Sequence, residues 1–265
     1  MKNNIKFTFI VPNYNKGIYI EECLASIYNQ TYNNYEVIVI DDGSTDNSVE
    51  EINKFSIDKF LVTNRRQAGG ARNEGLKYAT GDYIIFLDSD DYLTNNKVLE
   101  KLSNLINDED IIFLNFTKDN FGKIQEMIEN EEPISVKIEK TNLLGCPTKC
   151  FKRELIKELV FPENKRYEDI IFTLEALCKT QNYTYFKESF FTYRKVPNSN
   201  ATSPLLETAQ LDILEEIIKI YRLCVKYPKY KNNLMNRIKG DKIPLRLDIL
   251  NTLIETGENK YKDYF

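Results

Sequence analysis

Short apolar runs alternate with segments of helical periodicity along the first third of the chain. β-branched and aromatic residues fill 7–11 and 35–40, and turn residues end both runs, as is typical of buried strands in a parallel sheet. Between them, Ile20 and Leu24 belong to an apolar face that predicts a helix over 18–30. The chain therefore begins with a βαβ unit.

The same alternation continues as far as residue 87. The pattern predicts helices over 48–55 and 71–79 and strands over 60–63 and 83–87. Such a series indicates an α/β fold with a doubly wound, mainly parallel central sheet flanked by helices. Ligands of these sheets bind at the carboxyl ends of the strands, so the functional residues are expected there.

Past Asp91 the periodicity is less regular. The sequence predicts, in order, a helix over 97–106, a strand over 110–116, a variable acidic loop over 126–139, a helix over 168–179, aromatic-rich strand structure over 183–193 and a polar loop over 198–204. Apolar residues from Leu211 to Val225 then predict an amphipathic helix, and a last helix is expected over 245–254.

No repeat or low-complexity linker interrupts the chain. We therefore expect one α/β domain over 1–204, made of the halves 1–95 and 96–204. A C-terminal helical extension is expected over 205–265.

The charge balance narrows the possible partners. The formal net charge is −4, and no stretch has the dense Lys and Arg surface with which a nucleic-acid binder displaces phosphate counterions. From Lys226 to the end, however, nine Lys and Arg stand against five Asp and Glu. A solvated helical face explains this excess, and contact of the C-terminal basic helices with an anionic membrane surface or a charged lipid-linked acceptor is the alternative.

Composition also indicates a compartment. No apolar run approaches the ~20 residues of a membrane-spanning helix, and the run that ends at Pro12 is too short for a signal peptide. Five cysteines without a C-x-x-C pair suit free thiols in a reducing environment. We therefore expect a cytoplasmic protein, peripheral at the inner face of the plasma membrane if the basic helices contact lipid.

Two acidic motifs follow predicted strands. Residues 41–46 (DDGSTD) form either a turn with a helix cap or a site whose carboxylate accepts a hydrogen bond from a base ring N–H. Residues 88–91 (DSDD) bring together carboxylates that repel one another unless a divalent cation neutralises them. Mg²⁺ or Mn²⁺ that also holds phosphates needs few protein oxygen ligands. A solvated acidic loop is the simpler interpretation of this second motif.

Two further segments carry candidate chemistry. A glycine-bearing loop with arginines at both ends, residues 65–73, runs into a predicted helix, and helix N-terminal amides with a guanidinium bind diphosphate well. Glu168 and Asp169 begin another predicted helix, where they either compensate the helix dipole or supply a general base. The chain has no histidine, so a carboxylate is the natural base for an acceptor alcohol.

Taken together, these motifs resemble the family-two glycosyltransferases of the Rossmann-like GT-A fold. The segments that match, in family order, are 9–15 (FIVPNYN), 26–32 (SIYNQTY), 39–46 (VIDDGSTD), 70–73 (GARN) and 81–91 (GDYIIFLDSDD). This specific match covers about the first 95 residues. A looser match continues through 161–163 (FPE) and 167–170 (YEDI) to 193–194 (YR), and residues 146–153 depart from the aromatic-rich pattern of the family.

The resemblance implies roles in donor binding. Pro12 and Tyr14 would line the base pocket, and Asp42 would bind the edge of a uracil-like base. Arg72 would face the nucleotide and its diphosphate.

The resemblance also implies a metal and a base. Asp88 and Asp90 match the family's D-x-D signature, with Asp90 as the direct ligand of Mn²⁺ or Mg²⁺ and Asp88 nearer the ribose or the waters of the metal. Asp169 matches the carboxylate that acts as base, and Glu168 is the competing assignment. A single displacement at the anomeric carbon would then invert its configuration.

These roles imply a metal-dependent, inverting glycosyltransferase with a nucleoside diphosphate sugar donor, expected to be a UDP-sugar. The group transferred would be a hexosyl or N-acetylhexosaminyl unit. The acceptor would be a hydroxyl of a glycan or lipid-linked molecule in the synthesis of bacterial capsule, lipooligosaccharide or another surface polysaccharide.

Two alternatives have other functions: a non-catalytic sugar-nucleotide-binding subunit, and a nucleotidyltransferase that makes the sugar nucleotide. The intact set of Asp88, Asp90 and Asp169 opposes the first. The second normally has an N-terminal glycine-rich loop with Arg and Lys, and residues 12–17 hold only one glycine and one lysine.

Overall fold

The computed structural model describes residues 4–140, 145–165, 168–196 and 207–239 of the chain. The chain divides into two compact units. The first unit comprises 1–131 with 143–202 and contains the sheet; the second comprises 132–142 with 203–265, and its described part is helical. The boundaries expected at residues 95 and 204 stay predictions.

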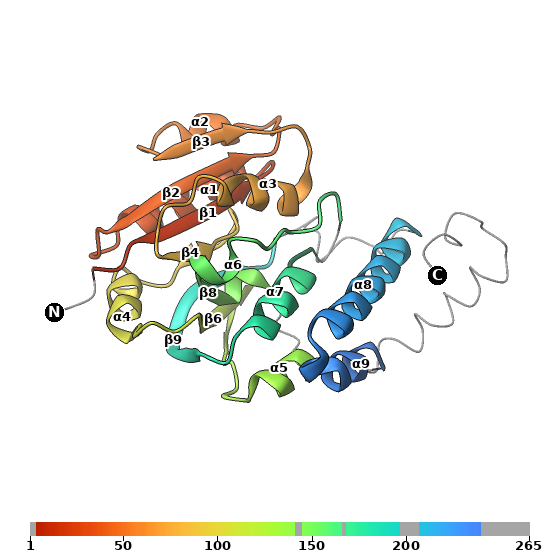
Figure 1. Cartoon of the computed structure of the whole chain (residues 1–265). Coiled ribbons are helices and arrows are strands. Elements are labelled where there is room, and N and C mark those ends of the chain that lie inside the picture. Colours follow the sequence, from red (N-terminus) through yellow and green to blue (C-terminus); the bar gives the residue numbers. More distant parts are fainter. Residues whose placement is uncertain (1–3, 141–144, 166–167, 197–206, 240–265) are drawn as a thin grey trace. The chain divides into compact units, whose positions relative to one another are not determined.

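Four parallel strands form the first half of the sheet, in the order β3-β2-β1-β4 (Figure 1). They are β1 (Phe7–Asn13), β2 (Tyr35–Asp41), β3 (Lys59–Val62) and β4 (Tyr83–Phe86). Every position of β1 is buried, which explains its nearly continuous apolar run. In register, Asn13 lies beside Asp41, so the polar residues that end these strands meet at one edge of the sheet.

The second half of the sheet is mixed. The order continues β8-β6-β9-β5, and β7 pairs with β6. Here β8 is antiparallel to both of its neighbours, whereas β6 and β9 are parallel to each other. The bounds of these strands are β5 (Tyr92–Leu93), β6 (Ile111–Asn120), β7 (Lys123–Met127), β8 (Lys149–Lys152) and β9 (Tyr183–Arg194).

Helices cover both faces of this sheet. Those of the first unit are α1 (Gly17–Tyr28), α2 (Ser48–Ile52), α3 (Gln67–Leu76), α4 (Val98–Leu105), α6 (Arg153–Ile156) and α7 (Glu168–Lys179), with a 3-10 turn η1 (Cys146–Thr148). On one face, Phe7 and Phe9 pack in a core with the buried side of α1. On the other, α3 lies so close that a Cβ added to Gly75 would come 2.7 Å from Cγ2 of Ile10. The predicted α/β fold, a central sheet flanked by helices, is confirmed.

Four phenylalanines join α7 to the sheet. The ring of Phe86 in β4 makes edge contacts with those of Phe151, Phe161 and Phe172, at centroid distances of 6.1, 5.2 and 5.9 Å. Phe161 and Phe172 stack on each other at 3.7 Å. Because Phe172 belongs to the first turns of α7, this cluster fixes the start of that helix relative to β4.

The second unit is helical in its described part. Its elements are α5 (Ile134–Lys140), α8 (Glu207–Lys226), the 3-10 turn η2 (Pro228–Tyr230) and α9 (Lys231–Lys239). Asn233 Nδ2 donates a hydrogen bond of 3.1 Å to Glu139 Oε2 and so joins α9 to α5. Among the described residues, no helix has both the length and the apolar character needed to cross a bilayer.

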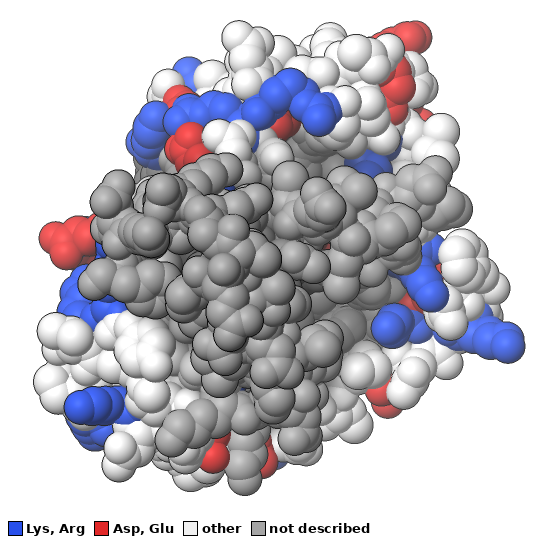
Figure 2. Space-filling view, turned by 90° about the vertical axis from the view of Figure 1, so that its right-hand side faces the viewer, with Lys and Arg blue, Asp and Glu red and all other residues white. Residues whose placement is uncertain are grey.

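On the face drawn in Figure 2, described Lys and Arg side chains lie in separate groups with Asp and Glu among them. The helix expected over 245–254 lies outside the described residues, together with the rest of 240–265. Contact of the C-terminal basic helices with a membrane therefore stays a prediction.

Periodicity located most elements of the first unit. The helix expected over 168–179 is confirmed with the same bounds as α7, and the strand expected over 35–40 ends one residue later, at Asp41. The helix expected over 71–79 begins earlier, at Gln67, because the segment that resembled a glycine loop forms the first turn of α3.

The acidic loop expected over 126–139 is confirmed over 128–133 and wrong at both ends. β7 continues to Met127, and α5 begins at Ile134. Ile134 and Ile138 are both buried, and their spacing of four residues provides a short apolar helix face that the surrounding acidic residues obscured. The polar loop expected over 198–204 lies outside the described residues.

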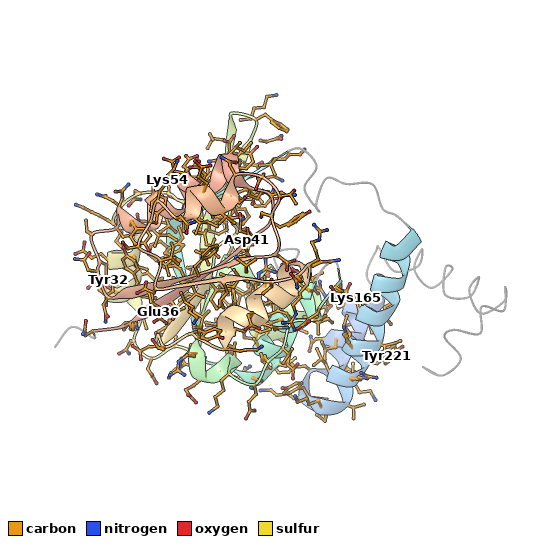
Figure 3. The ribbon with its side chains drawn as sticks, turned by 90° about the horizontal axis from the view of Figure 1, so that it is seen from above. Tyr32, Glu36, Asp41, Lys54, Lys165 and Tyr221 are labelled. Atoms are coloured by element: carbon orange, nitrogen blue, oxygen red, sulfur yellow. The ribbon has the colours of Figure 1, made fainter. Side chains whose placement is uncertain are left out.

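Glu36 lies near the start of β2, at the other end of the strand from Asp41 (Figure 3). Its carboxylate accepts hydrogen bonds from Thr8 Oγ1 and Thr80 Oγ1 at 2.6 Å and from Lys6 Nζ at 2.7 Å. Burial disfavours the charged form, but these donors outweigh it and lower the pKa of Glu36 to about 2. The buried carboxylate therefore ties β1, β2 and the segment before β4 together.

We expect Glu36→Gln to lower the free energy of unfolding by about 2 kcal/mol at pH 7, because the neutral amide accepts fewer and weaker hydrogen bonds. Since the folded pKa lies below the ordinary value, this stabilisation is complete above about pH 5 and is lost as the pH falls toward 2. Urea denaturation of both proteins at pH 7 and pH 3 measures it. An equal difference at both pH values would contradict the assignment.

Candidate active site

The acidic motif after β2 contains two carboxylates with different roles. Asp41 is fully buried and accepts hydrogen bonds from Asn13 Nδ2 at 2.8 Å and from Ser44 Oγ at 2.6 Å. It also accepts one from the backbone N–H of Ser44 at 2.8 Å. Asp41 therefore makes the turn that the sequence offered as one interpretation of this motif.

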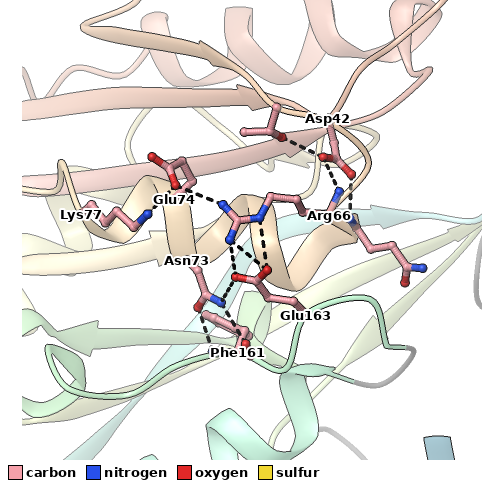
Figure 4. Close-up of polar contacts among 9 residues, drawn as sticks. Asp42, Arg66, Asn73, Glu74, Lys77, Phe161 and Glu163 are labelled. Atoms are coloured by element: carbon pink, nitrogen blue, oxygen red, sulfur yellow. Dashed lines mark hydrogen bonds and ion pairs between the residues drawn. The ribbon is translucent and has the colours of Figure 1, made fainter.

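Asp42 holds the loop between β3 and α3 (Figure 4). Its Oδ1 accepts hydrogen bonds from Thr63 Oγ1 at 2.7 Å and from the backbone N–H of Arg66 at 2.8 Å, and its Oδ2 accepts one from the backbone N–H of Gln67 at 2.7 Å. Arg65 and Gln67 have positive φ angles of 51° and 59°, which cost non-glycine residues ~1 kcal/mol each. The Asp42 carboxylate thus stabilises a strained loop.

Arg66 ties the same loop to the segment before α7 (Figure 4). Its guanidinium donates to both carboxylate oxygens of Glu163, the shortest bond being 2.7 Å from Nη2 to Oε1. Asn73 of α3 donates through Nδ2 to the carbonyl oxygen of Phe161 at 2.9 Å and accepts from the backbone N–H of Phe161 at 2.8 Å. Segments nearly a hundred residues apart are therefore fixed to each other.

Tyr14 and Arg65 lie over each other at the edge of this loop. The guanidinium carbon of Arg65 is 3.9 Å from the centroid of the Tyr14 ring, a close cation–π contact. Tyr14 is 38% exposed, whereas Pro12 is buried in β1. With Asp42, these residues surround the carboxyl ends of β1 and β2, where the sequence predicted a base pocket.

The acidic motif after β4 has a separate partner for each carboxylate. Asp88 Oδ1 accepts a hydrogen bond of 2.8 Å from Arg72 Nη2. Asp90 Oδ2 lies 2.6 Å from Lys16 Nζ. Asp91 is buried; its Oδ1 accepts the backbone N–H of Arg194 at 2.9 Å, and its Oδ2 has no partner among the described residues. Burial and the two neighbouring carboxylates raise the pKa of Asp91 well above its ordinary value.

Arg72 connects the end of β4 to the start of α7. It is only 3% exposed, and its two terminal nitrogens reach different carboxylates: Nη2 reaches Asp88, and Nη1 donates to Glu168 Oε1 at 2.5 Å. The guanidinium also lies over the Phe161 ring, 5.6 Å from its centroid. Arg72 was expected to face the diphosphate, but in this structure its terminal nitrogens are engaged by protein carboxylates.

Glycine makes the approach of α3 to α7 possible. A Cβ added to Gly69 would come 2.3 Å from the Pro162 carbonyl oxygen and 3.0 Å from Cγ of Glu168. No side chain fits in that space, so Gly69 is required for the packing of α3 against the start of α7.

Asp169 lies beside this network without an ion pair of its own among the described residues. Its Oδ2 is 3.4 Å from the position that a Cβ on Gly145 would take. Burial raises the pKa of Asp169, the neighbouring Glu168 raises it further, and Arg72 lowers it, with a net value of about 7. A carboxylate with a pKa near neutrality can exchange protons at physiological pH.

The donor set around Asp88 and Asp90 suits a hard divalent cation. Both side chains offer carboxylate oxygen, and both are part-exposed, at 33% and 16%. Within the described ranges, no three Asp, Glu or Cys side chains form a metal cage. Mg²⁺ and Mn²⁺ bound by one or two carboxylates complete their coordination with waters and phosphates, so these two residues fit such an ion.

The structure brings the predicted residues into two adjacent groups. One group contains Pro12, Tyr14 and Asp42, and the other contains Arg72, Asp88, Asp90, Glu168 and Asp169. Sequence reasoning missed the role of Lys16, whose ion pair with Asp90 spans 74 residues. It also missed Glu163, although that residue was part of the looser family match. Gly17 follows Lys16 and Pro162 precedes Glu163. Neither neighbour indicates the ion pair that Lys16 makes with Asp90 or the one that Glu163 makes with Arg66.

A doubly wound sheet with acidic residues gathered at the carboxyl ends of its strands is the arrangement of GT-A glycosyltransferases. Residues 8–195 match the family described as Glycosyl transferase family 2, and the chain belongs to that family. The protein is therefore a glycosyltransferase, and neither the non-catalytic subunit nor the nucleotidyltransferase is favoured.

Individual relatives agree with this membership. The chain is 36% identical over 210 residues to an uncharacterized glycosyltransferase of Haemophilus influenzae, covering 73% of this chain and 81% of the relative. It is 30% identical over 286 residues to the poly(ribitol-phosphate) beta-glucosyltransferase of Bacillus spizizenii, covering 92% of this chain but 43% of that longer protein. The crystal structure of Staphylococcus aureus TarS 1-349 in complex with UDP-GlcNAc is similar with a TM-score of 0.69 and 28% identity, covering 82% of this chain and 66% of that one.

We expect Arg72→Met to lower the free energy of unfolding by about 3 kcal/mol, because it leaves Asp88 and Glu168 without their shared cation in a part-buried site. Lys77→Met is the matched control: its ammonium pairs with Glu74 at 2.6 Å but is 60% exposed, so it should cost less than about 1 kcal/mol. Urea denaturation at pH 7 compares both with the wild type. Similar small losses in the two variants would contradict a central role for Arg72.

Proposed function

We propose that this glycosyltransferase moves a hexosyl or N-acetylhexosaminyl group from a UDP-sugar to an acceptor hydroxyl, with inversion at the anomeric carbon. The observation that carries the proposal is the chain of contacts from Asp88 through Arg72 to Glu168. It places the motif expected to bind the donor beside the motif expected to supply the base. The first belongs to the donor half, 1–95, and the second to the acceptor half, 96–204.

Asp169 is the better candidate for the base. Glu168 is engaged by Arg72, and its side chain is only 12% exposed, so its position suits a residue that orients the start of α7. Asp169 has a pKa raised to about 7, which lets it take a proton from an acceptor alcohol and release it near neutral pH.

The bond changes follow from this assignment. The acceptor oxygen forms a bond to the anomeric carbon as the bond between that carbon and the diphosphate oxygen breaks. Asp169 takes the acceptor proton, and the diphosphate leaves with the bonding electrons. One displacement from the opposite side inverts the configuration.

Asp90, with Asp88, would hold Mn²⁺ or Mg²⁺ together with the donor phosphates. The ion, when bound, neutralises the charge that develops on the leaving diphosphate. The carboxylate oxygens of the two residues and their partial exposure support this role. Arg72, held between Asp88 and Glu168, positions Asp88 and adds positive charge close to it.

The donor nucleotide is proposed to lie against Tyr14, near Pro12 and Asp42. Within the described segments, Oδ2 of Asp42 accepts one hydrogen bond, from the backbone N–H of Gln67, and it retains capacity for a base N–H. The similarity to TarS in complex with UDP-GlcNAc supports UDP. The similarity to a poly(ribitol-phosphate) glucosyltransferase supports a surface polysaccharide or its lipid-linked precursor as the acceptor class.

A donor screen tests the proposed reaction. The full chain is incubated with UDP-, GDP- and dTDP-sugars in the presence of Mn²⁺ or Mg²⁺, and release of the nucleoside diphosphate is followed. We expect a UDP-sugar to be consumed with metal and not with excess EDTA. If no donor is consumed with or without polyol-phosphate, glycan and lipid-linked acceptors, the proposed reaction is wrong.

We expect Asp169→Asn to reduce kcat by about 10²- to 10⁴-fold, the usual contribution of a general base, while UDP-sugar binding stays within about twofold. Isothermal titration calorimetry measures the binding, and product formation measures the turnover. The isosteric change removes the base but keeps the shape of the site. Unchanged turnover would reject Asp169 as the base and leave Glu168 to be tested as Glu168→Gln.

The pH profile provides an independent check on the same residue. A base must be deprotonated to act, so kcat/KM of the wild type should rise with pH and level off above about 7, the pKa of Asp169. The residual activity of Asp169→Asn should lack this rise. A wild-type profile that is flat from pH 5.5 to 8 would contradict the raised pKa.

A further inference from the structure

The two carboxylates of the D-x-D motif are neutralised by different kinds of cation. Asp88 pairs with Arg72, which is 3% exposed and binds Glu168 as well. Asp90 pairs with Lys16, whose side chain is 23% exposed and has this one ion pair within the described part of the chain. Arg72 is therefore held by two carboxylates, whereas Lys16 has one ion pair and a looser cation–π contact, with its Nζ 5.8 Å from the centroid of the Tyr19 ring.

The backbone of Lys16 is held by hydrogen bonds, whereas its side chain depends on the contacts of the ammonium alone. Its N–H donates to Ser48 Oγ at 3.1 Å, and the N–H of Gly17 donates to Asp46 Oδ2 at 2.8 Å. A Cβ added to Gly17 would come 2.0 Å from Asn47 Oδ1 and 3.0 Å from the backbone N of Ser48, so the start of α1 packs closely against the start of α2. Any movement of the ammonium must come from the four-carbon side chain, which is flexible and carries a point charge.

Lys16 also lies between the two parts of the proposed donor site. It stands two residues after Tyr14 in the chain, and its ammonium contacts the carboxylate proposed to bind the metal. A divalent ion on Asp90 and the ammonium of Lys16 cannot share that oxygen without strong repulsion at short range. The donor diphosphate, which would bind the same ion, offers the nearest new anionic partner.

We propose that Lys16 is an exchangeable counter-cation of the donor site: it occupies Asp90 when the metal is absent and moves to the donor diphosphate when the metal takes its place. This inference rests on the proposed function, because it assumes a metal–diphosphate donor complex. Lys16 then opposes binding of the metal alone and favours binding of the metal with the nucleotide. Asp90 is thus paired with a cation between turnovers, and the enzyme takes up metal and donor together.

The inference predicts changes of opposite sign in a single variant. In Lys16→Met, Asp90 has no competing cation, so Mn²⁺ should bind the free protein about tenfold more tightly, the size of one charge-assisted hydrogen bond. The affinity for UDP at saturating Mn²⁺ should fall by about the same factor, since the diphosphate loses a cation. A residue with a purely structural role would weaken both.

Mn²⁺ affinity is measured by electron paramagnetic resonance of the free ion, and UDP affinity by calorimetry, both at pH 7.5 on the full chain. Lys16→Arg keeps the charge and should remain within about threefold of the wild type in both measurements. Lys152→Met is the matched control, because Lys152 forms an ion pair of the same 2.6 Å with Asp108 outside the site. Thermal melting confirms that each variant is folded, and Lys16→Gln replaces Lys16→Met if the latter is not.

The outcomes separate the inference from the function on which it rests. Tighter Mn²⁺ binding with weaker UDP binding in Lys16→Met, and neither change in Lys152→Met, supports the exchange. If both affinities fall, or neither changes, while the wild type binds Mn²⁺ and UDP, the exchange is wrong and the glycosyltransferase proposal stands. If the wild type binds neither Mn²⁺ nor UDP, the proposed donor chemistry itself is wrong.

Discussion

The guanidinium of Arg72 is the interaction on which the active edge of the sheet depends. Burying this charge without partners would be very unfavourable, and the structure places a carboxylate on each side of it. Because Asp88 follows β4 by two residues and Glu168 begins α7, the pairing of one buried cation fixes two distant elements against α3. Gly69 permits the close approach of α3 to α7. The Phe161 ring, which stacks on Phe172, lies under the guanidinium and supports it. The same contacts of Arg72 therefore fix the positions of both the proposed donor residues and the proposed base.

The same network gives the carboxylates of this histidine-free chain different electrostatic surroundings. Asp88 and Asp90 each pair with a cation, at 2.8 and 2.6 Å. Asp169 is part-buried next to Glu168; desolvation and Glu168 raise its pKa, Arg72 lowers it only partly, and the net value is about 7. Differences in the electrostatic environment thus give chemically identical groups separate roles. In the proposed reaction, the proton transfer that imidazole performs in other enzymes would fall to a carboxylate, because the chain has no histidine.

Local patterns were sufficient for most of the fold and failed where a polar residue is buried. The strands β1, β2 and β4 are buried on both faces, so their apolar runs were readable directly. β8 was missed because it begins with a lysine, yet Lys149 is fully buried, and its ammonium donates to Thr148 Oγ1 at 2.7 Å. A sequence pattern assigns lysine to the surface. The oxygen atoms that accept from this ammonium, Thr148 Oγ1 and the Gly145 carbonyl, come from the turn directly before β8, and the residue pattern does not show the shape of that turn.

The candidate site was predictable as a set of residues but not as a set of contacts. Motif order indicated Asp42, Arg72 and Asp169, whereas the Arg72–Glu168 pair spans 96 residues and has no local signature. Asp42 is an example of contacts that the motif does not reveal. The sequence offered a turn or a base-binding carboxylate, and the structure gives the turn to Asp41 and makes Asp42 the support of the strained loop at Arg65. Loss of the Asp42 carboxylate would release this loop and with it the Arg65–Tyr14 contact, so even a residue that binds the base directly would also act through the shape of the pocket.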